Sequence, residues 1–302
     1  LIPIGYNGID QIHLDNVIDR SSTIEKIIRS MSSNKLTTIC APEMSGKTSL
    51  ASLTYNWLTC RPSFNGHSII LVSMLDKDSS SSSLEEEKTF EKKWNSLVGT
   101  PFSQLVQDAH ASRKLVIILD EANILYELKD AQLFWTFARQ VQQRSFENVS
   151  LLLFVKHDSG RLMDSSNSIF ESCLSFDMVV YNRNEFKLFM ISIERLIEEA
   201  DNPTLEALEA KIHELSGGHP GILACLKKKM LDEYRGDQNR PLTLKFIDWL
   251  LDSNDLVTYI GQQRCCSFLK NFSEDQTEIC RQILLDNPPL QSFSMAEIYN
   301  TE

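Results

Sequence analysis

The chain has 302 residues, of which 42% are hydrophobic and 24% are charged, and its formal net charge is −11. This composition supports about two globular domains, and the acidic charge argues against nonspecific binding of nucleic acid by the whole surface. None of the seven cysteines has metal-ligand spacing, so we expect reduced thiols in an intracellular, reducing compartment. No apolar run approaches the ~20 residues that cross a bilayer, and we expect no membrane partner.

In chain order, the first predicted element is a helix within residues 1–34, with Ser21 or Ser22 as its N-cap. Five short apolar runs then predict strands at 36–40, 68–75, 114–120, 149–155 and 175–181. Helical spacing between them predicts helices at 47–58, 89–111 and 131–144. Buried strands that alternate with helices predict an α/β fold, a parallel five-stranded sheet with helices on both faces.

The apolar pattern becomes helical after residue 182. The sequence therefore predicts four segments: an entry segment with the first helix (1–34), an α/β core (35–182), a helical lid (183–240) and a helical tail (241–302). A serine-rich polar stretch at 76–88 predicts a surface loop. Because the chain starts at Leu1 rather than Met, we expect it to be part of a longer protein.

A phosphate-binding loop is predicted where the first strand meets the next helix. Residues Ala41–Thr48 (APEMSGKT) match the P-loop (Walker A) pattern G-x-x-x-x-G-K-[ST] except at the first position, where Ala41 replaces Gly. Backbone N–H groups of such a loop, with the helix N-terminus, bind phosphates. Lys47 is the predicted catalytic contact to the β- and γ-phosphates, and Thr48 the predicted Mg²⁺ ligand. The predicted nucleotide contacts are Ala41, Met44, Ser45, Gly46, Lys47, Thr48 and Ser49.

A second acidic motif ends the most apolar strand. Residues 116–121 (VIILDE) match a Walker B strand that ends in Asp120 and Glu121. We expect its carboxyl end beside the P-loop, because ligands of open α/β sheets bind there. Asp120 is predicted to hold Mg²⁺, and Glu121 is the predicted catalytic residue that polarises the attacking water. The alternative is that these two acids only begin a turn.

The spacing of the two motifs leaves room for one helix–strand–helix insertion that contains residues 68–75. This arrangement resembles the additional-strand class of P-loop NTPases rather than P-loop kinases or small GTPases. The chain has no NKxD guanine motif. The expected cofactors are therefore ATP or ADP together with Mg²⁺.

Three further motifs resemble the AAA+ and STAND branch of P-loop ATPases. Residues 17–20 (VIDR) are similar to an entry motif that flanks the adenine, which implies contacts from Asp19 and Arg20; the alternative is an N-capping pair. Lys156-His157 follows a strand where this branch places a sensor-1 residue, or it is a solvated strand end. Gly218-His219-Pro220 ends one helix and opens the next, and its similarity to a G-x-P lid motif implies that His219 and Pro220 lie at the nucleotide.

The strings APEMSGKTSLA, IILDEANILY and LSGGHPGI resemble the ATPase module of Crinkler-type and RHS-type effector proteins, over roughly residues 15–235. The chain departs from that family at Asn123, where Gln is common. The resemblance implies a protein that is secreted and delivered to a host cell nucleus. It also implies a partial winged-helix-like module within 241–302, for which a plain helical cap is the alternative.

Together these motifs predict an ATP-binding and ATP-hydrolysing P-loop domain that acts as a nucleotide-driven switch in a larger protein. The alternatives are a nucleotide-binding scaffold without hydrolysis, which Ala41 favours, and a DNA-associated ATPase that binds nucleic acid through its C-terminal region or a further domain. Expected partners include a second copy or another protein that supplies an arginine finger. Arg139, Arg144 and Arg161 are the candidates within this chain.

Overall fold

A computed structural model describes residues 18–42, 44–75, 89–111, 114–156, 173–174, 178–194 and 202–236. The serine-rich stretch at 76–88, His157, Arg161 and the tail expected to be winged-helix-like lie outside these described residues. The chain divides into two compact units. The first is Leu1–Arg195 with Gly218–Gly221, and the second is Leu196–Gly217 with Ile222–Glu302.

The first unit is built on a parallel sheet with the strand order β2-β3-β4-β1-β5. Its strands are β1 (Leu36–Ala41), β2 (Ser68–Ser73), β3 (Leu115–Asp120), β4 (Val149–Lys156) and β5 (Cys173–Leu174). The P-loop strand β1 and the Walker B strand β3 both pair with β4, which lies between them. The strand predicted at 68–75, between the two motifs in sequence, is β2, and it pairs with β3 at the edge of the sheet.

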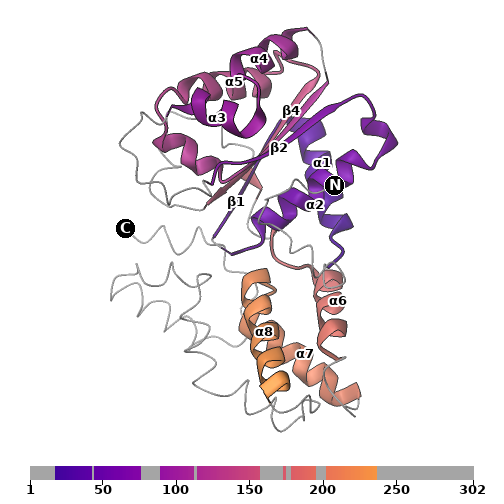
Figure 1. Cartoon of the computed structure of the whole chain (residues 1–302). Helices are drawn as coiled ribbons and strands as arrows, with labels where there is room; N and C mark the ends of the chain where they lie inside the picture. The colour runs from indigo at the N-terminus through magenta and orange to yellow at the C-terminus, as the bar shows by residue number, and fades with distance from the viewer. Residues whose placement is uncertain are drawn as a thin grey trace, which may run out of the picture. The chain divides into compact units, whose positions relative to one another are not determined.

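The strands are apolar on both sides because helices cover both faces of the sheet (Figure 1). In β4, Leu151 and Leu153 pack with the helices α3 (Phe90–Val98), α4 (Phe102–His110) and α5 (Gln132–Gln142). The alternate residues Leu152 and Phe154 pack with α1 (Ser21–Asn34) and α2 (Lys47–Thr59) on the opposite face. This alternation explains why β3 is buried along its whole length, as a two-sided core requires.

Helices α3, α4 and α5 are held to the sheet by a cluster of aromatic rings. Phe90, Trp94 and Phe102 are fully buried, and the Phe102 ring centroid lies 5.0 Å from the ring centroids of both other residues. Phe134 of α5 joins them, with its centroid 5.7 Å from that of Phe90. Aromatic edges packed on aromatic faces give these helices a specific arrangement as well as a large buried apolar area.

Three predicted elements differ from the structure. The single helix expected at 89–111 is two helices, because Gly99 takes a φ of 79° that ends α3 and Pro101 precedes α4. The fifth strand lies at Cys173–Leu174, and Met178–Val180, which were expected to be strand, form a turn. Neither Ser21 nor Ser22 is the N-cap of α1; Arg20 holds that position.

The remaining elements are short 3-10 helices and the helices of the C-terminal half. The 3-10 helices are η2 (Pro62–Phe64) and η3 (Ala122–Glu127), the latter directly after β3. Helix α6 (Arg183–Glu194) belongs to the first unit. Helix α7 (Asn202–Ser216) and most of α8 (Pro220–Gly236) form the described part of the second unit. None of the described helices is long and apolar enough to span a bilayer.

Candidate functional site

The predicted P-loop connects β1 to α2 through a tight turn. Gly46 takes a φ of 88° and Met44 a φ of 55°, both in the left-handed region that turns of this kind use. The Ser45 hydroxyl is fully buried and donates to the Pro42 backbone oxygen at 2.8 Å. Helix α2 then starts at Lys47, so its first free N–H groups lie at this loop.

Lys47 is a buried cation within this loop. Its side chain is 4% exposed, and Nζ donates to the backbone oxygens of Ala41 at 2.9 Å and Pro42 at 2.6 Å. A buried ammonium group requires acceptors of this kind, because it would otherwise lose its hydration without replacement. The backbone oxygens of the loop therefore fix the position of the Lys47 ammonium group.

The P-loop and the Walker B strand meet through one hydrogen bond. The Thr48 hydroxyl donates to Oδ2 of Asp120 at 2.8 Å, and Asp120 is 1% exposed. These residues lie 72 positions apart in the chain, and the parallel sheet brings them together because α2 begins and β3 ends at the same edge. A hydroxyl oxygen and a carboxylate oxygen are thus paired at the loop that also contains Lys47.

These two oxygens fit a magnesium ion that is held mainly by a ligand. Mg²⁺ prefers oxygen donors and is commonly bound by one or two protein groups together with phosphate and water. In the part of the chain that the structure describes, no group of three or more His, Cys, Asp and Glu side chains could hold a metal by itself. Thr48 and Asp120 supply two oxygen atoms of the kind that a phosphate-bound Mg²⁺ uses.

The backbone directly after Asp120 is strained at Glu121. Glu121 has a φ of 55°, a conformation that non-glycine residues seldom adopt. Glu121 is half-buried, and its backbone oxygen accepts from the Ile124 N–H at 3.1 Å as η3 begins. Backbone strain of this kind is common at functional sites, and here it places a carboxylate immediately beyond Asp120.

Asn123 links η3 to the end of β4, a contact that sequence reasoning missed. Its Oδ1 accepts from the Lys156 backbone N–H at 3.0 Å. Lys156 in turn pairs with Ala41 in the sheet register, so the position expected to carry a sensor residue lies beside the start of the P-loop. In the sequence, the signal for this contact is the presence of Asn123 two residues after Glu121.

Residues Gly218–Gly221 pack directly on the P-loop within the first unit. A Cβ placed on Gly221 would lie 2.4 Å from the Met44 backbone oxygen, and one on Gly46 would lie 3.4 Å from Cβ of Pro220. The Tyr181 N–H donates to the Gly218 backbone oxygen at 2.9 Å. Gly221 was not among the predicted site residues, although its contact with Met44 leaves no room for a side chain.

His219 lies inside this contact as a neutral acceptor. Its side chain is 7% exposed, and Nδ1 accepts from the Gly221 N–H at 3.1 Å. Burial lowers the pKa of His219 to about 4, and the positive charge of Lys47 adds to this effect. The imidazole is therefore uncharged near neutral pH.

The structure places Asp19 and Arg20 in intramolecular contacts. Asp19 Oδ1 accepts from the Ser21 N–H at 2.9 Å and the Ser21 hydroxyl at 2.6 Å, which is a capping role at the start of α1. Arg20 is buried and donates to Oε2 of Glu185 at 3.3 Å. The Arg20 guanidinium also stacks over the ring of Tyr181, 5.2 Å from its centroid. Their predicted contact with an adenine stays a prediction.

Glu185 is a second residue that sequence reasoning missed. It is 2% exposed, accepts from the Thr23 hydroxyl at 2.6 Å and from the Asn182 N–H at 3.0 Å, and pairs with Arg20. These contacts join α1, the turn before α6 and α6 itself into one buried network. No sequence signal marked Glu185, because Arg20 and Thr23, its partners in α1, lie 165 and 162 positions away along the chain.

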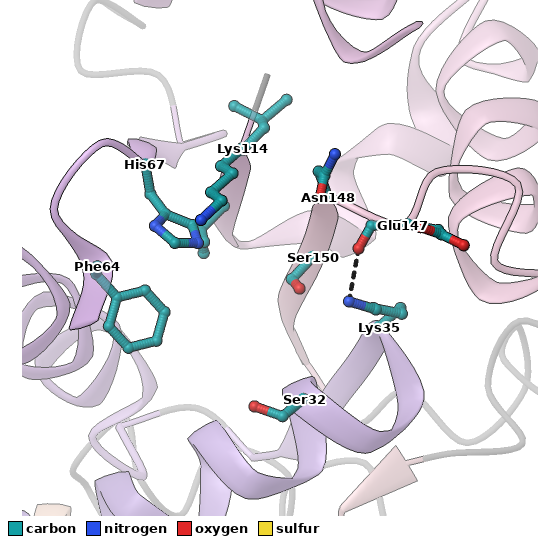
Figure 2. Close-up of a pocket in the computed structure, with 10 residues that line it drawn as sticks. Ser32, Lys35, Phe64, His67, Lys114, Glu147, Asn148 and Ser150 are labelled. Carbon is teal, nitrogen blue, oxygen red and sulfur yellow. Dashed lines mark hydrogen bonds between the residues drawn. The ribbon is translucent and has the colours of Figure 1, made fainter. Parts of the chain in front are cut away.

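The opposite edge of the sheet carries a polar cavity of about 250 Å³. Its walls come from residues just before the strands, among them Lys35, His67, Lys114 and Asn148 (Figure 2). The Lys35 ammonium group donates to the Glu147 backbone oxygen at 2.7 Å, the bond that is dashed in Figure 2. This cavity, the amino-end pocket, contains none of the predicted site residues.

Two arginine-finger candidates can be placed. Arg144 donates to the Ser33 backbone oxygen at 2.7 Å, at the end of α1 and the amino end of the sheet. This position is on the opposite edge from the P-loop, so Arg144 does not complete its own chain's site. Arg139 lies in the last turn of α5, which also runs toward that edge.

The fold has counterparts among solved structures. The Walker-type ATPase PABY2304 of Pyrococcus abyssi matches with a TM-score of 0.51 and 16% identity, over 90% of this chain and 81% of that chain. The ORC1 protein of Aeropyrum pernix, solved in complex with DNA, matches with a TM-score of 0.49 and 16% identity, over 94% of this chain and 76% of that chain. No protein-family model and no curated protein matches. At this identity the first likeness concerns the fold alone, so the chain has the α/β fold of a Walker-type ATPase.

Proposed function

We propose that this chain binds ATP with Mg²⁺ at the P-loop and hydrolyses it. The observation that carries the proposal is the 2.8 Å hydrogen bond between the Thr48 hydroxyl and Asp120, which joins the two motifs at one edge of the sheet. Lys47 lies buried in the same loop. A buried ammonium group, an adjacent hydroxyl–carboxylate pair and a helix N-terminus together suit a polyphosphate that carries a divalent cation.

Each residue of the loop has a distinct task in this proposal. The Lys47 ammonium group, now held by the Ala41 and Pro42 backbone oxygens, exchanges these neutral acceptors for charged phosphate oxygens. Thr48 and Asp120 hold Mg²⁺, which when bound neutralises charge on the β- and γ-phosphates. A phosphate oxygen adds the attraction of a full negative charge to the hydrogen bond from the ammonium group, so the exchange favours the nucleotide complex.

Glu121 is the proposed base that orients the attacking water. Glu121 follows Asp120 directly and has a positive φ; in this proposal its carboxylate accepts a hydrogen bond from the attacking water. A positioned general base contributes roughly 10²–10⁴ in rate. The distinction between Asp120 and Glu121 follows from burial, since Asp120 is 1% exposed and Glu121 is half-buried.

The contact between Gly218–Gly221 and the P-loop supports a switch function. Gly221 touches the Met44 backbone and Pro220 touches Gly46, so any change in the P-loop on binding or loss of the γ-phosphate reaches these residues. They open helix α8, whose remainder belongs to the second unit. Nucleotide state is thereby proposed to be transmitted to the C-terminal half of the chain.

Binding is tested by titration of the purified chain with ATP and ADP, with and without Mg²⁺. We expect Mg²⁺-dependent binding that Lys47→Ala weakens roughly 100-fold or more, because a charge-assisted contact to phosphate is lost. Lys114→Ala is the matched control, since Lys114 is an exposed lysine of the amino-end pocket. Equal affinities of wild type and Lys47→Ala would contradict the proposed site.

Hydrolysis is tested separately, because a nucleotide-binding scaffold without turnover is the competing function. That alternative is favoured by Ala41, which stands where P-loops have glycine and is fully buried in β1. We expect wild type to release phosphate, and Glu121→Gln to bind ATP with unchanged affinity while turnover falls roughly 10²–10⁴-fold. Wild type that binds tightly but shows no turnover at any protein concentration would establish the scaffold function instead.

We further propose that the chain is the ATPase module of a larger effector-type protein of the Crinkler or STAND kind, with a host cell nucleus as its destination. The support is the set of sequence strings around the P-loop, the Walker B strand and Gly218–Gly221. A fluorescent fusion of the complete protein, expressed in a eukaryotic host cell, tests this part. Accumulation in the nucleus is expected, and exclusion from it would contradict the proposed destination.

A further inference from the structure

Two thiols from distant parts of the sequence meet at the edge of the sheet. Cys40 is in β1, directly before the P-loop, and Cys173 begins the edge strand β5. Their Sγ atoms are 2.6 Å apart, which is about half an ångström longer than a disulfide bond. Strand pairing holds them there, because Thr38 is the register partner of Cys173 and Cys40 follows two residues later on the same face.

The two thiols differ in their surroundings. Cys173 is exposed, and Cys40 is half-buried against the core on the α5 side of the sheet. The side-chain contact with Cys40 lowers the pKa of Cys173. The same contact, together with burial, raises the pKa of Cys40. The pair therefore offers an accessible sulfur that ionises readily and a resolving sulfur within bonding reach.

We propose that Cys40 and Cys173 form a reversible disulfide that fastens the edge strand β5 to the P-loop strand. Of the other described cysteines, Cys60 is exposed at the end of α2, and Cys225 is buried in α8. Both sulfur atoms of the proposed disulfide lie at the junction of β1 and β5. The disulfide stands independently of the proposed nucleotide hydrolysis.

A small-molecule disulfide such as oxidised glutathione supplies the oxidant. The Cys173 thiolate attacks one sulfur of that disulfide, which forms a mixed disulfide and releases one glutathione thiolate that takes up a proton. The Cys40 sulfur, after losing its proton to solvent, then attacks Sγ of Cys173 and releases the second glutathione. The two protein thiols lose two electrons in total, and the oxidant gains both.

The linkage should stabilise the fold at its weakest strand. Strand β5 has only two residues, which pair with Thr38 and Ile39, so few backbone hydrogen bonds retain it. The disulfide closes a loop of 133 residues between Cys40 and Cys173, and loop closure restricts the unfolded chain. We expect the oxidised protein to unfold at a temperature roughly 5 °C or more above that of the reduced protein.

The experiment equilibrates the purified chain with oxidised and reduced glutathione, blocks free thiols with iodoacetamide and maps tryptic peptides by mass spectrometry. Trypsin releases Cys40 within residues 36–47 and Cys173 within 162–183, each as the single cysteine of its peptide. We expect these two peptides to be linked after oxidation and separate after reduction. Cys40→Ser and Cys173→Ser should each abolish the link and the thermal shift, whereas Cys60→Ser should preserve both.

Several outcomes would overturn the inference. Both cysteines could be alkylated in full at every glutathione ratio, or Cys173 could carry glutathione without transfer to Cys40. Linkage of either peptide to a different cysteine would also contradict it. Peptide mapping is performed on the wild-type chain, so the result does not depend on whether a serine variant folds.

Discussion

At the carboxyl ends of β1 and β3, polar side chains are buried and bonded to one another: Lys47 to loop carbonyls, and Thr48 to Asp120. At the amino ends of the same strands, the pocket of about 250 Å³ also contains lysines, but Lys114 is exposed and Lys35 donates to a backbone oxygen. Both edges carry positive charge on an acidic chain, but at the carboxyl edge the lysine is buried and a neighbouring hydroxyl donates to a buried carboxylate.

The two edges differ in how their polar side chains are buried and paired, rather than in the presence of lysine alone. Burying charged groups costs free energy unless they are paired, so a chain retains them only where they have a structural or chemical task. The carboxyl edge also contains the backbone strain at Met44 and Glu121. At the amino-end pocket, the turns before the strands supply lysine and asparagine side chains.

The largest expected effect comes from breaking the buried ion pair that supports the carboxyl edge. Glu185→Ala leaves the Arg20 guanidinium buried without its charged partner, and we expect a loss of about 3–5 kcal/mol in the free energy of unfolding. Glu147→Ala, an exposed acid at the amino edge, should change it by less than about 0.5 kcal/mol. Urea denaturation of both variants measures the difference, and similar losses would refute the contrast between the edges.

The next effect concerns the close approach of Gly221 to Met44. Gly221→Ala places a methyl group 2.4 Å from a backbone oxygen, so the P-loop must move, and we expect nucleotide affinity to fall roughly tenfold or more. Gly217→Ala is the control, because nothing lies within 4 Å of its Cβ and only its own positive φ is strained. Calorimetric titration with Mg²⁺-ATP compares the two; equal affinities would mean that the contact is not coupled to the loop.

A smaller effect is the pH dependence contributed by His219. Its pKa falls from an ordinary 6.5 to about 4 in the folded chain, so the unfolded chain binds the proton more tightly. The stabilisation is complete above pH 6.5 and is lost as the pH falls toward 4. Between about pH 7.5 and about pH 5 the loss should be about 2 kcal/mol.

His219→Asn tests this contribution, because an amide oxygen can accept the Gly221 N–H but does not titrate. The variant should lose less stability than wild type over the same pH range, in denaturation curves recorded at each pH. Parallel pH profiles for the two proteins would show that the histidine is protonated in the folded state as easily as in the unfolded one.

The smallest effect is expected at the amino-end pocket. Lys35→Ala removes only a bond to the Glu147 backbone oxygen, so we expect a change in unfolding free energy of about 0.5–1.5 kcal/mol and no change in nucleotide affinity. Thermal denaturation and nucleotide titration check these two expectations. A marked loss of nucleotide affinity would show that the two edges of the sheet are coupled.

The sequence predicted most of the sheet and the positions of the Walker A and Walker B segments at strand ends, because these depend on local patterns. Continuous apolar runs such as 115–119 specify a strand that is buried on both faces. The string around Lys47 and Thr48 combines strand, turn and helix start within a few residues, so its geometry follows from local backbone preferences. Gly99 and Pro101 also indicate the break between α3 and α4. The prediction of one helix was wrong because it followed the apolar spacing instead of these two residues.

The partners of individual side chains could be decided only by the tertiary structure. Arg20 pairs with Glu185, 165 positions away, and Cys40 meets Cys173 across 133 positions. Such pairs depend on which strands lie side by side and on how the helices pack. Strand order and helix packing are set by the free energy of the whole core rather than by that of any one segment. The sequence by itself thus determined which chemical groups the chain carries and which elements hold them; the packing decided which of those groups touch.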